Sequence, residues 1–125
     1  PYREGGGTVN QVIHHVADSH MNAFIRFKLG LTEDNPTIKP YSQSAWGETA
    51  DVTAVPVNLS ITLLHSLHHR WYELLKTITD EQWERTIYHP EQQRKITLWE
   101  LLLIYAWHGK HHAAHVTNLR EQMGW

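Results

Sequence analysis

Two histidines near the end of the chain, His108 and His112, lie four residues apart. Residues at this spacing project from the same side of a helix, and here that side carries mostly apolar residues. Because a buried polar group without a partner costs about 1–3 kcal/mol, both imidazoles need partners. A divalent metal ion could satisfy both, since His-x3-His on a helix is a metal-binding spacing. Hydroxyl groups or waters could satisfy them as well, and the spacing leaves both interpretations open.

A metal site of this kind needs at least one further protein ligand, and the first helical segment offers candidates. Periodicity favours His20, which lies near the centre of the apolar face of that segment. His15 lies at the flank of this face and begins a polar stripe, which continues with Ser19, Asn22 and Arg26. The stripe could line a cleft between helices. On spacing alone, a solvent-facing side of the helix is the favoured interpretation.

Other polar residues are candidates for supporting roles. Asp18 lies three residues after His15 and could orient a histidine through its carboxylate, or could be an ordinary surface charge. His111 and His115 flank the apolar face of the last segment, where exposed positions are expected and an outer role beside the metal is the alternative. The remaining histidines outside the first segment lie off the apolar stripes or in a loop and are expected at the surface: His65, His68, His69 and His89.

The first of three predicted helices runs from Thr8 to about Leu29. Thr8 and Gln11 have the spacing of a capping box, and Gly30 is a suitable C-terminal cap. Apolar residues at helical spacing define its buried face: Val9, Val12, Ile13, Val16, Phe24 and Phe27.

Two further helices follow a long connection at residues 31–57, in which prolines interrupt every helical pattern. The second helix is expected from residues 58–60 to about residue 79. The third begins at Thr97, which forms a second capping box with Glu100. A short helical turn is expected around residues 81–85, and no strand pattern is convincing.

These elements predict an all-α fold, an up-and-down helical bundle in a single domain over residues 1–125. The length of 125 residues, with 41% hydrophobic and 19% charged residues, fits one packed core. Tyr41 and Trp46 are expected to pin the long connection to the bundle. Three long helices are few for such a bundle, so an upstream helix or a partner chain is expected to complete it.

The composition argues against several classes of protein. With 11 Lys and Arg against 13 Asp and Glu, the net charge of −2 gives no electrostatic case for nucleic-acid binding. The absence of cysteine excludes disulfides and cysteine nucleophiles. No apolar run approaches the roughly 18 residues of a membrane-spanning helix, and no signal-peptide pattern opens the chain. A cytoplasmic protein without membrane or nucleic-acid partners is therefore expected.

Distinctive segments lie along nearly the whole chain: residues 12–22 (VIHHVADSHMN), 25–29, 39–41, 45–46, 67–71, 79–83, 88–90, 105–115 (YAWHGKHHAAH) and 123–125. Together they resemble the DinB/YfiT-like superfamily, most closely its YfiT branch. Members of that branch are described as candidate metal-dependent hydrolases and as bacillithiol S-transferases. The resemblance implies a four-helix bundle that holds one divalent metal ion through three histidines. It also implies that the first helix of the family is missing from this chain.

Carried over by motif, the three metal ligands are His15, His108 and His112, so the resemblance overrides the periodicity that favours His20. Zn²⁺ and Ni²⁺ suit such a site best, with Fe²⁺ and Mn²⁺ as other choices. Water as the nucleophile gives a hydrolase, and a low-molecular-weight thiol gives an S-transferase with bacillithiol as a co-substrate. The resemblance favours the thiol, with a small electrophile as its partner in the reaction.

Arg26 and Asn22 are expected to line the route to the metal, with Arg26 holding a carboxylate of the thiol or substrate. No side chain is a convincing catalytic base. The alternative to an enzyme is a non-catalytic His-rich metal-binding or structural module with a closed coordination shell. A missing helix should leave an apolar groove uncovered and so favour a homodimer; its predicted residues are Val9, Val16, Phe24, Leu67 and Trp71.

Overall fold

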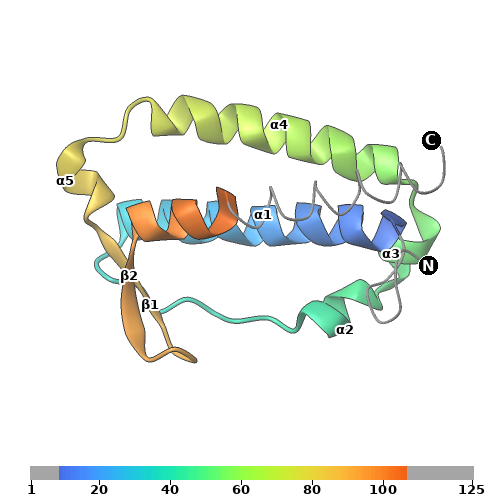
Figure 1. The fold of residues 1–125 in the computed structure, drawn as a ribbon, viewed down its shortest axis with the longest axis horizontal. Helices are drawn as coiled ribbons and strands as arrows, with labels where there is room; N and C mark the ends of the chain where they lie inside the picture. Colours follow the sequence, from blue (N-terminus) through green and yellow to red (C-terminus); the bar gives the residue numbers. More distant parts are fainter. Residues whose placement is uncertain (1–8, 107–125) are drawn as a thin grey trace.

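The computed structural model describes residues 9–106, and two long helices form its frame (Figure 1). Helix α1 (Val9–Thr32) and helix α4 (Val57–Leu75) pack side by side and run in the same direction. The connection between them must therefore cross back along the whole length of α1. No helix among residues 9–106 combines the length and the apolar character that a membrane span requires.

The crossover between α1 and α4 carries two short helices, α2 (Gln43–Gly47) and α3 (Ala50–Ala54), where the sequence predicted a plain loop. The Ser42 hydroxyl caps α2 by accepting from the backbone N–H of Ala45 at 3.1 Å. In α3, the buried Val52 side chain gives the helix its anchor. Each helix has only five residues, too few for an apolar period to be visible in the sequence.

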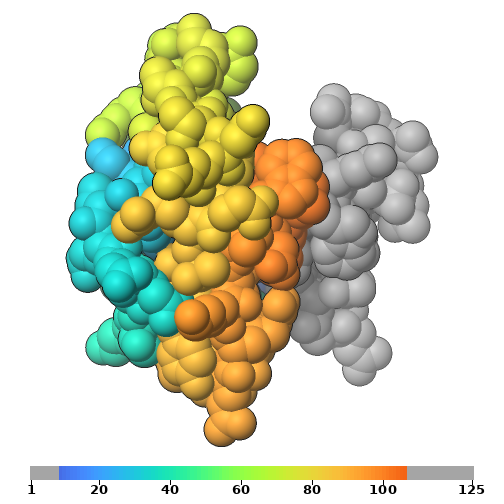
Figure 2. Space-filling view, turned by 90° about the vertical axis from the view of Figure 1, so that its left-hand side faces the viewer, coloured from blue at the N-terminus to red at the C-terminus, as the bar shows by residue number. Residues whose placement is uncertain are grey.

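A short helix and a β-hairpin follow α4. Helix α5 (Asp80–Trp83) is the helical turn that the sequence predicted. Strands β1 (Thr86–His89) and β2 (Arg94–Thr97) are antiparallel, and the prediction that the chain has no strand is wrong. Each strand has only four residues, so its alternation of apolar and polar side chains is too short to recognise in the sequence. The space-filling view from the α5 end shows α5 and the hairpin closing that end of the molecule (Figure 2).

The chain is helical again over residues 98–106, and this segment runs antiparallel to α1 (Figure 1). Its start confirms the predicted capping box. The Thr97 hydroxyl accepts from the backbone N–H of Glu100 at 3.0 Å, and the Glu100 carboxylate accepts from the backbone N–H of Thr97 at 3.4 Å. The predicted Thr8–Gln11 capping box includes Thr8, which lies outside the described part of the chain, so this box stays a prediction.

The sequence predicted Gly30 as the C-terminal cap of α1, but Gly30 lies inside the helix, which continues to Thr32. A Cβ atom at this position would be 2.6 Å from the Leu98 Cδ2 atom and 3.2 Å from the Ile87 Cγ2 atom. The glycine therefore lets the hairpin and the helix at residue 98 approach the backbone of α1. These contacts belong to the core cluster: Ala23, Phe24, Phe27, Ile38, Leu67, Trp71, Ile87, Ile96, Leu98 and Leu101.

The predicted apolar groove differs from the observed surface. Phe24 and Leu67 are buried in the core cluster, and Val9 and Val16 are half-buried. Trp71 is only 5% exposed, although its side chain borders a cavity. The exposed large apolar side chains lie elsewhere, mainly on the outer sides of α4 and of residues 98–106: Leu59, Ile61, Leu63, Tyr72, Trp99, Leu103 and Ile104.

Candidate metal centre

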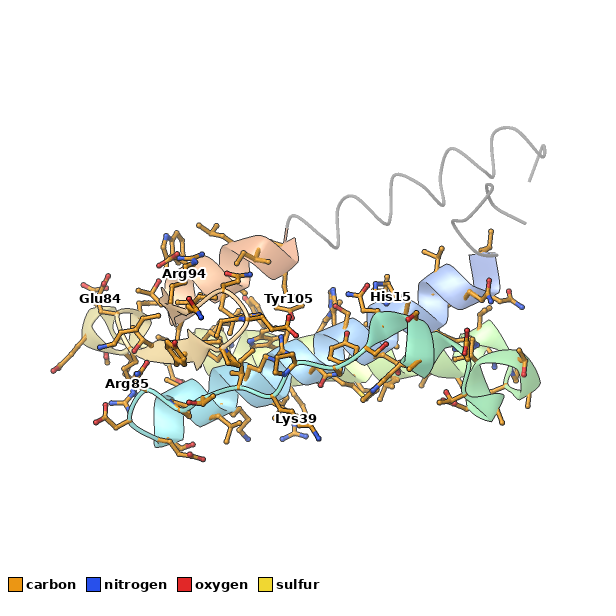
Figure 3. All side chains as sticks on the ribbon, turned by 90° about the horizontal axis from the view of Figure 1, so that it is seen from below. His15, Lys39, Glu84, Arg85, Arg94 and Tyr105 are labelled. Atoms are coloured by element: carbon orange, nitrogen blue, oxygen red, sulfur yellow. The ribbon has the colours of Figure 1, made fainter. Side chains whose placement is uncertain are left out.

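His15 is the one predicted metal ligand within the described residues, and it lies half-buried in the first half of α1 (Figure 3). His108, His112 and the neighbouring His111 lie outside the described part of the chain. Within residues 9–106, no three His, Asp or Glu side chains come together in a way that could hold a metal ion. The three-histidine site therefore stays a prediction.

Both ring nitrogens of the adjacent His14 form hydrogen bonds within the fold. Its Nε2 atom lies 2.9 Å from the carbonyl oxygen of Val55, and its Nδ1 atom lies 2.6 Å from the Ser60 hydroxyl. Because a carbonyl can only accept, Nε2 donates to Val55, and Nδ1 shares a hydrogen bond with the Ser60 hydroxyl. Both ring nitrogens are used in joining α1 to the start of α4, so His14 has none left for a metal ion.

His20, the ligand that periodicity favours, faces the core and pairs with α4. Its Nδ1 atom lies 2.7 Å from the Nε2 atom of His68, with the two ring centroids 4.9 Å apart. Burial is the main cause that lowers the pKa of His68, and the nearby His65 adds to it. His68 is exposed, as the sequence predicted, and it also contacts His20 of α1.

Asp18 shares its surroundings with charged groups from two elements. Burial raises the pKa of the Asp18 carboxyl, the negative charge of Asp51 raises it further, and His14 acts in the opposite direction. The role of Asp18 in orienting a metal-bound histidine stays a prediction.

The polar stripe of α1 is covered by the crossover, in contrast to the solvent-facing side that spacing favoured. Ser19 is only 6% exposed. The rings of Tyr41 and Trp46 pack against each other with centroids 4.8 Å apart, and the guanidinium of Arg26 lies 5.9 Å from the centroid of the Tyr41 ring. Asn22 donates its side-chain amide to the Asp18 carbonyl of its own helix at 2.9 Å. The stripe is thus partly covered by the crossover.

Arg26 joins three parts of the fold. Its Nη1 atom donates to the Tyr105 hydroxyl at 3.2 Å, and its Nη2 atom donates to the carbonyl of Lys39 at 3.1 Å. Tyr105 reaches α1 from the last described helix, and Lys39 belongs to the crossover (Figure 3). Among the described residues, Arg26 forms no ion pair with a carboxylate.

Tyr41, which the sequence predicted only as an anchor of the long connection, also lies near this stripe. Burial raises the pKa of its phenol, and the nearby Tyr105 phenol raises it further. A hydrogen bond with Ser19 and the positive charge of Arg26 act to lower it. No spacing rule links residues 19, 41 and 105, because they lie on α1, on the crossover and on the last described helix, and only the packing of these elements brings them together.

A cavity of about 340 Å³ opens between α1, α4 and the last described helix. His20, His68 and Tyr105 contribute polar atoms to it, and the rest of its wall is mostly apolar: Trp71, Tyr72, Leu75, Leu102 and Ala106. The indole nitrogen of Trp71 is buried without a hydrogen-bond partner among the described residues.

A family model for the DinB superfamily matches residues 1–116. The chain belongs to the DinB superfamily. Among its relatives, a candidate metal-dependent hydrolase from Bacillus subtilis (strain 168), YfiT, is 53% identical over 125 residues, which are all of this chain and 70% of that protein. A candidate metal-dependent hydrolase from Bacillus cereus (strain B4264) is 52% identical over 126 residues, covering all of this chain and 71% of that protein.

A solved structure of YfiT from Bacillus subtilis matches this DinB chain with a TM-score of 0.95 and 53% identity. The match covers all of this chain and 71% of the YfiT chain. That protein is described as a probable metal-dependent hydrolase with an unusual four-helix bundle topology. The resemblance inferred from the sequence is therefore confirmed for the family and for the four-helix bundle fold.

Proposed function

We propose that this DinB chain is a metal-dependent enzyme in which His15, His108 and His112 hold one divalent ion. The observation that carries the proposal is its 53% identity, over its full length, to a candidate metal-dependent hydrolase. The chemistry of the donor set fits, because three neutral imidazoles suit Zn²⁺ or Ni²⁺, and also Fe²⁺ or Mn²⁺, and leave further coordination positions open.

The contacts within α1 support His15 as the ligand from this helix. His14 uses both ring nitrogens in structural hydrogen bonds, and His20 is directed toward His68 in the core. His15 instead begins the polar stripe that the crossover covers, next to Ser19, Asn22 and Arg26. A ligand at this position would put the metal beside donors that can hold a substrate.

A metal ion bound there would lower the pKa of a water or thiol and polarise an electrophile. A water nucleophile makes the protein a hydrolase, and a thiol such as bacillithiol makes it an S-transferase acting on a small electrophile. We favour the thiol, because Arg26 has no carboxylate partner among the described residues and suits an acidic thiol. We place the reaction in the cytoplasm. Asn22 would line the same route, while Asp18 and His111 would orient the ligands.

Metal analysis of purified protein tests the site. His15→Ala, His108→Ala and His112→Ala should each reduce the metal content of protein purified without added metal, as measured by elemental analysis. His89→Ala, in the hairpin, is the matched control and should keep the metal. Turnover of a thiol with a halo-aromatic compound or an epoxide, and hydrolysis without thiol, should be lost with the metal.

Two other results would separate the alternatives. If the wild type binds metal through these histidines but turns over no substrate, the protein is a metal-binding or structural module. If the three variants retain the metal of the wild type, the proposed ligand set is wrong.

A further inference from the structure

We propose that His65 and His69, on the outer side of helix α4, form a second site for a divalent transition-metal ion. This site is separate from the proposed three-histidine centre and does not depend on it. Two imidazoles hold the ion and water fills its remaining positions, so the ligand is a hydrated ion of the kind that imidazole suits, Cu²⁺, Ni²⁺ or Zn²⁺. The sequence predicted both histidines only as surface residues.

The spacing of the two histidines makes them neighbours on one side of α4. His65 and His69 are four residues apart within one continuous helix, Val57–Leu75. Side chains at this spacing lie one turn apart on the same face, with their Cβ atoms roughly 5–6 Å from each other. Two helical histidines bind a single zinc ion at this spacing in metalloproteases. The pair therefore has the spacing that a shared metal ion requires.

Both histidines lie on the side of α4 that faces away from the core. They come two positions before Leu67 and Trp71, which belong to the core cluster together with residues of α1. Two residues correspond to about 200° around a helix, so the pair lies nearly opposite the packed side. Both residues are exposed, and Figure 1 shows α4 along one edge of the molecule with α1 on its inner side. An ion from solution thus reaches the pair without a change in the fold.

The two imidazoles are not engaged elsewhere in the described part of the chain. No hydrogen bond or ion pair within residues 9–106 involves His65 or His69. His68 differs, because its Nε2 atom lies 2.7 Å from the Nδ1 atom of His20 and is directed toward α1. No third His, Asp or Glu side chain of residues 9–106 joins the pair in a metal-binding group, which leaves the other coordination positions to water.

The cationic side chains of α4 near the pair contact other groups. The Arg70 guanidinium lies 5.4 Å from the centroid of the Phe24 ring, and the Lys76 ammonium pairs with Glu73 at 3.1 Å. Of the three ions, Cu²⁺ should bind most tightly, because affinities of divalent ions for such ligands generally peak at copper. The histidines have this spacing only in the helix, so the ion binds the folded chain in preference to the unfolded chain and stabilises it.

Calorimetric titration of metal-free protein with Cu²⁺ tests the site. The affinity for one ion per chain should fall at least about tenfold in His65→Ala and in His69→Ala, since loss of a mere outer partner of a ligand already costs about 10–100-fold. The matched control is His69→Ala/Ser66→His, which keeps the number of histidines but places two of them at adjacent positions, where they do not face each other. This control should bind as weakly as His69→Ala.

Urea unfolding with and without Cu²⁺ is a second measurement. Cu²⁺ should raise the urea midpoint more in the wild type than in the two single variants or the matched control. Unchanged Cu²⁺ affinity in the single variants, or wild-type affinity in the matched control, would overturn the site. An effect of Glu73→Gln as large as that of His65→Ala would also overturn it, because the ion would then lie between His69 and Glu73.

His15→Ala separates this inference from the proposed function. Retention of the α4 ion in that variant supports a second site, whether or not the three-histidine centre exists. Loss of the ion dependent on His65 and His69 in His15→Ala would show that the two sites are not separate, and would overturn the inference.

Discussion

Three histidines of α1 have different partners although they are alike in the sequence. His14 bonds Ser60 and Val55, His20 bonds His68, and His15 begins the covered stripe. Periodicity correctly predicted that His20 lies on the core face of α1. It could not predict that the partner of His20 there is His68 of α4. The choice of His15 came from the resemblance to a family, because its position at the flank carried no signal. The partners of a histidine depend on neighbouring elements that its own segment does not specify.

Arg26 offers a prediction at the residue scale. Arg26→Ala should weaken binding of an acidic thiol about tenfold, because a charge-assisted contact is lost, while the metal content stays unchanged. Calorimetric titration with the thiol measures the first effect and elemental analysis the second. The control is Arg94→Ala, since the Arg94 side chain is exposed and pairs with Glu100. Equal thiol affinity in Arg26→Ala would remove this role.

Asp18 offers a second prediction, on the pH dependence of stability. Its pKa in the folded protein is raised, first by burial and then by Asp51, so the folded state binds more protons than the unfolded state. The free energy of unfolding should therefore fall as the pH rises from the ordinary pKa of 3.8 through the raised pKa of the folded state. Asp18→Asn should be more stable than the wild type near neutral pH.

Urea unfolding over a pH series checks this expectation. The advantage of Asp18→Asn should shrink as the pH falls and should be lost below 3.8, where the wild-type carboxyl is protonated in both states. Asp34→Asn, at an exposed position, is the control. A constant difference at every pH would show that the titration of Asp18 is not its cause.

At the scale of elements, local signals predicted the starts of two helical segments. The Thr97–Glu100 box and the turn near residue 81 are stabilised by contacts within a few residues, so the sequence shows them directly. The hairpin and the two crossover helices are short and depend on tertiary contacts such as those of Ile87 and Val52, which no local pattern reveals. Gly30 was misassigned for the same reason, because its neighbour is Leu98.

Gly30 provides a prediction at this scale. Gly30→Ala should lower the free energy of unfolding by about 1–3 kcal/mol, since the new Cβ would overlap the Leu98 side chain. The gain in helix propensity, about 1 kcal/mol, offsets only part of this loss. Gly47→Ala is the matched control, because nothing lies within 4 Å of the Cβ position there. Urea unfolding of both variants measures the difference, and a more stable Gly30→Ala would contradict the close approach.

At the scale of the whole molecule, the helical content and the family could be predicted from apolar periodicity and distinctive segments. The shared direction of α1 and α4 could not, because helix patterns carry no information on direction. Because α1 and α4 run in the same direction, the crossover returns along α1 and covers its polar stripe. The α1 segment alone does not reveal this cover, so its spacing favoured a solvent-facing stripe.

The exposed apolar side chains support a prediction about assembly. Leu59, Leu63 and Tyr72 on α4, with Trp99 and Leu103 on the last described helix, are each at least 39% exposed. We expect a second copy of the chain to cover part of this surface, giving a homodimer or a larger assembly. Light scattering measures the mass in solution, and Leu59→Lys should shift a dimer toward the monomer. A monodisperse wild-type monomer would contradict this expectation.

The return path from α1 to α4 separates two kinds of change. Residues 37–47 cover the polar stripe, yet they contribute only Ile38 to the core cluster. Apart from that position, substitutions there would change the cover of the proposed site while the helical frame keeps its packing. Members of the superfamily that differ in this stretch could therefore share one scaffold and still select different compounds.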